Sequence, residues 1–148
     1  PKDININAAI SDNEENKTLY FVDELNTQNT LEANHLSFLK NHHNVREEEI
    51  SKQIIKTRRL DKILDSHNFN DIDFMNIDVE GHELNILNSI DFLKYNIKFI
   101  CIEMIDHNDQ AKIINKKLNE ILERNGYILE KKLDFNFIFK KNNYDKKN

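Results

Sequence analysis

The spacing of apolar and polar residues along the chain predicts an alternation of strands and helices. Alternating or continuous apolar runs predict strands at 4–11, 17–24, 52–58, 73–79 and 97–104, and a closing hairpin of 127–132 and 135–141. Apolar residues three and four positions apart predict helices at 59–69, 82–90 and 108–126. The stretch 25–44 has no clean period, so it predicts a long exposed connection with at most one short helix around 31–39. Connections of this kind often carry function.

The longest predicted helix, 108–126, has signals at both ends. Asp106 or Asn108 can cap its start, and Arg124 suits the negative end of the helix dipole. Gly126 offers the left-handed residue at which helices commonly stop. The predicted apolar stripe of this helix consists of Ala111, Ile114, Leu118, Ile121 and Leu122.

The order of the predicted elements favours an α/β fold. Strand–helix alternation from residue 52 onward is typical of a parallel sheet covered by helices on both faces. The strands 73–79 and 97–104 are apolar on both sides, as the central strands of such a sheet are. The final antiparallel hairpin belongs at an edge. The chain has no internal repeat and no Pro/Gly/Ser-rich linker, so the sequence predicts one domain over 1–148.

Composition and charge narrow the functional classes. A chain of 148 residues that is 39% hydrophobic can form a real core and predicts a soluble globule. A net charge of −5 argues against a general nucleic-acid binder, which needs a basic face. No apolar stretch approaches the roughly 20 residues of a membrane span and no signal peptide is visible, so we expect a cytoplasmic protein without a membrane partner. The one cysteine, Cys101, lies in an apolar strand and predicts a buried, reduced thiol.

Polar residues gather where one apolar strand ends. Asp78, Glu80 and His82 follow that strand around Gly81, one of only two glycines in the chain. Glu103 ends the next predicted strand. Ligands of open α/β sheets bind beyond the carboxyl ends of the strands, and parallel neighbours share one rim. We therefore expect Asp78 and Glu103 to lie close together, beside a turn that glycine allows to be sharp.

Each of these residues also has a structural interpretation. Asp78 could cap the next helix, and Glu80 could be solvated. Glu83, in the first helical turn, could complement the helix dipole, and His82 could lie on the surface. Glu103 is harder to explain in this way, because a lone buried carboxylate is costly. It needs a partner such as a backbone amide, a cation or a substrate hydroxyl.

Four segments then appear in a characteristic order: "INAAISDNEENKTLYF", "KTRRLDKIL", "IDFMNIDVEGHELNIL" and "IKFICIEM". Their order and spacing resemble those of FkbM-type S-adenosylmethionine-dependent methyltransferases. The most specific part is the "IDVEGHE" core, preceded by a "T-x-x-LD" segment. The resemblance extends from Ile4 to Lys140, which is nearly the whole chain.

The resemblance implies a Rossmann-like methyltransferase fold, mostly parallel with a C-terminal antiparallel hairpin. It implies methyl transfer from S-adenosylmethionine to a hydroxyl of a small molecule or sugar. Asp78 would face the methionine half of the cofactor or the acceptor, and Glu80 or His82 would be the general base. Alternatively, Asp78 and Glu103 could hold a divalent cation, although two carboxylates alone specify no ion. The segment expected beside the adenine comprises Asn7, Ala8 and Ala9.

The sequence departs from the family pattern at its start. With Gly81 and Gly126 as the only glycines, the chain has no glycine-rich cofactor loop, and it begins where the family's third strand begins. We expect the chain to be either a part of a longer product or a natural short form. In both cases we expect it to bind the cofactor weakly or not at all. Missing strands would expose an apolar sheet edge, which favours oligomers. The alternatives are a degenerate, non-catalytic binding module and a carboxylate-based hydrolase using Glu80 and Glu103.

Overall fold

The computed structural model describes residues 3–22, 28–104 and 116–142, apart from the side chain of His42. The elements in the first half are β1 (Ala9–Ile10), β2 (Asn16–Phe21), α1 (Ala33–His42), a 3-10 helix η1 (Glu47–Glu49), β3 (Ser51–Arg58) and α2 (Leu60–Ser66). Those in the second half are β4 (Asp71–Ile77), α3 (Glu83–Asn88), β5 (Asn96–Glu103), α4 (Lys116–Arg124), β6 (Tyr127–Leu133) and β7 (Asn136–Lys141).

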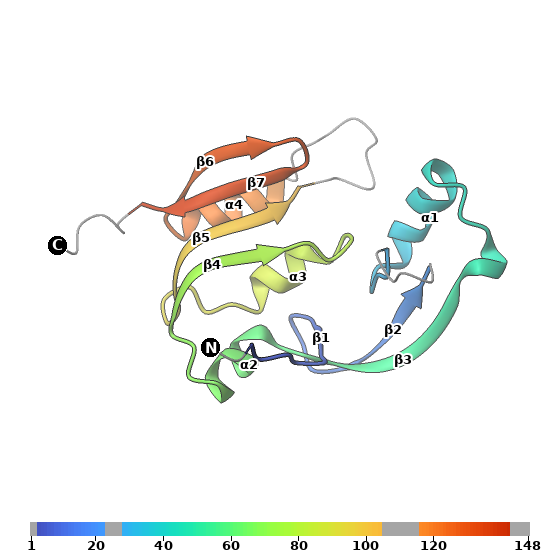
Figure 1. Ribbon diagram of the computed structural model, residues 1–148, viewed down its shortest axis with the longest axis horizontal. Coiled ribbons are helices and arrows are strands. Elements are labelled where there is room, and N and C mark those ends of the chain that lie inside the picture. The colour runs from blue at the N-terminus through green and yellow to red at the C-terminus, as the bar shows by residue number, and fades with distance from the viewer. Residues whose placement is uncertain (1–2, 23–27, 105–115, 143–148) are drawn as a thin grey trace.

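The described strands form two sheets rather than one. The first has the order β1-β3-β2 and the second the order β4-β5-β7-β6. Figure 1 shows the second sheet on one side of the molecule, and the first sheet with α1 extending away from it. The mixed α/β class is confirmed. The expected single, mostly parallel sheet is not what the described strands form, because only β1–β3 and β4–β5 pair in parallel, whereas β2–β3, β5–β7 and β6–β7 pair antiparallel.

The larger hydrophobic core lies on one face of the second sheet. Ile100 and Ile102 of β5 are fully buried there, against Leu87 of α3 and Leu122 of α4. Both helices lie behind the sheet in Figure 1. The alternate residues of β5, such as Cys101, are only half-buried. The described helices α3 and α4 therefore cover one face of this sheet, instead of the two faces that the sequence pattern predicts.

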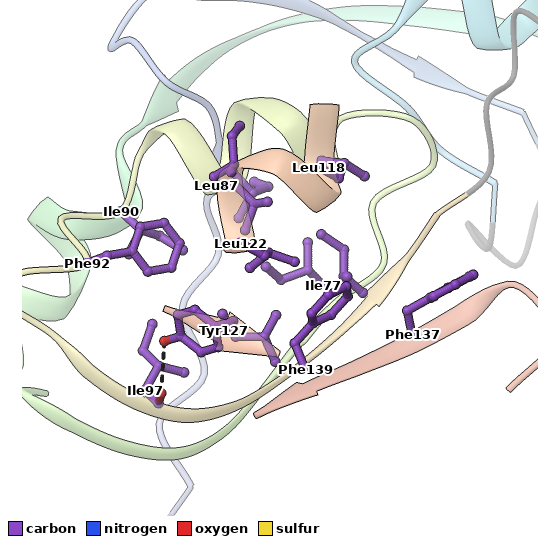
Figure 2. Packing of buried hydrophobic residues seen from close by; sticks show 14 of the residues in the cluster. Ile77, Leu87, Ile90, Phe92, Ile97, Leu118, Leu122, Tyr127, Phe137 and Phe139 are labelled. Atoms are coloured by element: carbon purple, nitrogen blue, oxygen red, sulfur yellow. Dashed lines mark hydrogen bonds between the residues drawn. The ribbon is translucent and has the colours of Figure 1, made fainter. Parts of the chain in front are cut away.

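The junction of α4 with β6 follows the sequence signals closely. Gly126 has φ +82° and ends the helix as expected. Tyr127 then enters the core, where its hydroxyl donates a 2.8 Å hydrogen bond to the carbonyl of Ile97 (Figure 2). Figure 2 also shows Phe139 of β7 in the same cluster. Leu118, Ile121 and Leu122 are buried as predicted, whereas Asp106, Asn108, Ala111 and Ile114 lie outside the described residues.

The first sheet has a small core of its own. Val22, Leu36 and Leu39 are buried together where α1 packs near the end of β2. The predicted helix in the long connection is confirmed as α1, although it begins and ends later than expected. The first predicted strand is reduced to the two residues of β1, and Ile4 and Ile6 before it are exposed.

No helix in the described part of the chain is both long enough and apolar enough to cross a membrane.

The outer edge of β4 has no partner among the described strands, and it carries an exposed aromatic side chain. Phe74 of β4 is 55% exposed. An unpaired, apolar strand edge is a template for association between chains. We therefore expect Phe74→Lys to lower self-association, measured by sedimentation velocity across a concentration series. The matched control is Leu93→Lys, because Leu93 is 98% exposed but lies in a turn. Equal effects of the two substitutions would contradict a role for the strand edge.

Candidate functional site

A sharp turn joins β4 to α3, and a buried carboxylate holds it. Glu80 and Gly81 both have positive φ, at +54° and +96°. The side chain of Glu83 folds back, so that one oxygen accepts hydrogen bonds from the amides of Val79 (3.1 Å) and Gly81 (3.2 Å). Glu83 is only 4% exposed, and burial raises its pKa while these hydrogen bonds oppose the rise. Its role is therefore to close the turn, beyond complementing the helix dipole.

Asp78 and Glu103 lie at adjacent strand ends, as expected. Ile77 pairs with Ile102 in the parallel register of β4 and β5, which places the following residues on the same rim. The pKa of Glu103 is raised to about 8, first by burial and then by the negative charge of Asp78. Smaller contributions come from Glu80 and Glu83.

The two carboxyl groups have different surroundings. Asp78 is exposed and has no hydrogen-bond or ion-pair partner among the described residues. Its pKa is raised by partial burial and by the charge of Glu80. Near neutral pH, Glu103 therefore mostly keeps its proton. Two carboxyl groups with such different surroundings can divide into a base and an acid.

His82 is buried, so its interpretation as a surface histidine is wrong. It is 1% exposed, and both ring nitrogens have partners. Nδ1 lies 2.5 Å from Oε1 of Glu32, and Nε2 lies 3.1 Å from Oγ of Ser11. The N-cap position that His82 occupies on α3 shows no side-chain capping bond. Its ring instead links the turn to two segments that are distant in sequence.

Glu80 makes a second link to the same distant segment. One of its carboxylate oxygens lies 3.2 Å from Nε2 of His35, which is 2% exposed. The hydroxyl of Thr30 donates a 2.7 Å hydrogen bond to the backbone carbonyl of Glu80. Glu80 is therefore partly sheltered and lies close to a buried histidine, rather than being simply solvated.

A cavity of about 270 Å³ opens between the first sheet and this turn. Of the residues singled out from the sequence, Ala8, Ala9, Asp78, Glu80 and His82 line it, whereas Asn7, which is exposed, and Glu103 are not part of the lining. Its remaining walls are Ile10, Leu19, Asn29, Leu31, Val79 and Ile86. The contributions of residues 29–35 were not predicted from the sequence. The only signal there was a polar, aperiodic stretch containing a histidine.

The described residues contain no group of three or more His, Cys, Asp or Glu side chains arranged to hold a metal ion. Asp78 and Glu103 alone do not make such a group. The expected thiol at Cys101 is free and half-buried, and burial raises its pKa.

A pocket at the carboxyl ends of parallel strands is where α/β folds bind small ligands.

The chain belongs to the FkbM methyltransferase family, because residues 1–129 of its 148 match the model of the methyltransferase FkbM domain. This match confirms the resemblance seen in the sequence. No curated protein and no solved structure gives a significant match to the chain.

The raised pKa of Glu103 predicts a pH-dependent stability. The folded protein binds this proton more tightly than the unfolded chain, so its contribution to stability is lost as pH rises from 4.5 to about 8. The full shift corresponds to roughly 5 kcal/mol, and partial solvent exposure reduces the expected loss to about 2 kcal/mol. Glu103→Gln should therefore flatten the dependence of the free energy of unfolding on pH, measured by urea titration at pH 5, 7 and 9. Glu130→Gln, at an exposed site on β6, should leave the wild-type slope unchanged.

Proposed function

We propose that this chain takes part in methyl transfer from S-adenosylmethionine to a hydroxyl of a small molecule or sugar. The observation that supports this most is Asp78, a carboxylate without a partner among the described residues, in the wall of a largely apolar pocket, in a member of a methyltransferase family. The proposal includes a Rossmann-like placement of the site, at the rim where β4 and β5 end.

The pocket residues fit the two chemically different ends of such a cofactor. Ala8, Ala9 and Ile10 offer an apolar wall suited to a nucleobase, and Asp78 and Glu80 offer negative charge to its cationic end. Bound there, the cofactor supplies a methyl group on a positively charged sulfur. A cavity of about 270 Å³ lies just below the roughly 300–1,000 Å³ typical of ligand sites. We therefore expect this chain to bind the cofactor weakly.

Methyl transfer to a hydroxyl requires that the acceptor oxygen be held in position and that another group accept the hydroxyl proton. The acceptor oxygen must approach the methyl group in line, and holding it there provides much of the acceleration. As the new carbon–oxygen bond forms, the hydroxyl proton must leave. Asp78 is the carboxylate best suited to take it, because it lines the pocket without a partner among the described residues. Of the other candidates, His82 is hydrogen-bonded to Glu32, and Glu80 lies 3.2 Å from a ring nitrogen of His35.

Asp78→Asn tests this assignment. It should reduce methyl transfer about 100-fold or more, because an amide cannot accept the proton, and it should change the affinity for S-adenosylmethionine much less. For the wild type, the rate should rise with pH through the raised pKa of Asp78. The measurement is transfer of a labelled methyl group to a panel of monosaccharides, with cofactor binding followed by calorimetry.

The control for this experiment is Asp73→Asn, at an exposed position on β4, the strand that ends just before Asp78. It should leave transfer unchanged. Equal transfer by Asp78→Asn and the wild type would contradict the role of Asp78 as base. Cofactor binding without any transfer would favour the alternative of a non-catalytic binding module.

A further inference from the structure

A buried hydrogen-bonded chain passes through His82. It begins at Asp12, whose Oδ1 lies 3.0 Å from the hydroxyl oxygen of Ser11. The same hydroxyl oxygen is 3.1 Å from Nε2 of His82, and the chain ends where Nδ1 of His82 meets Oε1 of Glu32 at 2.5 Å. Ser11 is fully buried and His82 nearly so, which keeps the hydroxyl and the ring from turning to bulk water instead.

The number of protons available along this row of hydrogen bonds determines the protonation state of the His82 imidazole. Ionised Asp12 and Glu32 can only accept hydrogen bonds, and Ser11 has a single proton to give. The pKa of Asp12 is lowered, chiefly by a hydrogen bond from Asn85, and that of Glu32 by its bond to His82, so both are ionised near neutral pH. Ser11 gives its proton to Asp12, so Nε2 of His82 must donate to Ser11.

The protonation of Nδ1, on the other side of the His82 ring, is fixed in the same way. Nδ1 faces the carboxylate of Glu32 and must also donate. A neutral imidazole, with one proton, would leave one of the three contacts as two facing lone pairs. Leaving a hydrogen bond unmade in a buried site destabilises the fold, so the doubly protonated ring is favoured.

We propose that His82 is a positioning residue held as an imidazolium by Glu32 and Ser11, and that it is not the base of the proposed reaction. The charged ring ties the N-terminal segment and the start of α1 to the turn that presents Asp78. The other titratable groups around this turn are Asp78, Glu80, Glu83 and Glu103, with His35 3.2 Å from Glu80. The positive charge of Lys17 acts on Asp12 and Glu32. The positioning role rests on the proposed function, whereas the protonation state of the ring does not.

The consequence for the pocket follows from its lining. Ile10 precedes Ser11, Leu31 precedes Glu32, and both line the cavity together with His82. The hydrogen-bonded chain therefore sets the relative position of three pocket walls that come from segments up to 71 residues apart. Glu32 and Ser11 act through His82 and do not themselves line the cavity.

Nitrogen-15 NMR of the whole chain with labelled histidine tests the proposal. At pH 7 we expect the His82 ring, assigned by its loss in His82→Asn, to show the imidazolium signature with protons on both nitrogens. Glu32→Gln should change it to a neutral ring with its proton on Nε2, because the side-chain amide introduced by this substitution can donate to Nδ1 while the bonds to Ser11 and Asp12 remain. Glu48→Gln, at an exposed site, should leave the wild-type signature unchanged.

A neutral His82 in the wild type would overturn the proposal, and so would an unchanged imidazolium in Glu32→Gln. If Glu32→Gln fails to fold, the wild-type spectrum alone still decides the protonation state. A further readout is cofactor affinity, which should fall in Glu32→Gln and be restored by Glu32→Asp if the charge is what positions the walls. The NMR measurement needs neither cofactor nor acceptor, so a failure of methyl transfer would leave its result standing.

Discussion

The hydrogen bonds from two backbone amides to the buried carboxylate of Glu83 hold the arrangement on which the candidate site depends. They close the turn after β4. This turn presents Asp78, Glu80 and His82 to the pocket. A carboxylate is well suited to this task because it accepts several amide protons at once, which offsets the cost of its burial. The positive φ at Glu80 is the local cost of so tight a turn, whereas Gly81 adopts its positive φ without steric strain.

The acids around this turn do not behave as one uniform negative patch. Glu83 is engaged by amides, and Glu80 is paired with a buried histidine. Glu103 holds a proton near neutral pH because its burial is reinforced by Asp78. Asp78 is left as the carboxylate that is open to the cavity and has no partner among the described residues. The chemical character of the site thus comes from the distinct surroundings of residues of one type.

Local sequence patterns predicted the elements around the site well. The apolar run of β4, the glycine after it and the matching end of β5 led directly to Asp78 and Glu103. The partners Thr30, Glu32 and His35 could not be found in this way, because they lie about 50 residues from the turn and contact it only in the folded chain. The division into two sheets was missed for a similar reason. Apolar periodicity shows that a segment is a strand, but the choice of neighbouring strand is made by long-range packing.

The two hydrophobic clusters, one under the β4-β5-β7-β6 sheet and one under α1, share no buried member. The contact between the two halves of the chain is mixed. Ile10, Leu60 and Leu64 pack in or against the larger cluster, and hydrogen bonds join Tyr95 to Asp61 and Asn85 to Asp12. Thr30, Glu32 and His35 add polar contacts to the turn after β4. A molecule seated in the cavity would contact residues of both halves at once. Its occupancy should then be readable as a heat-absorption peak that moves to higher temperature.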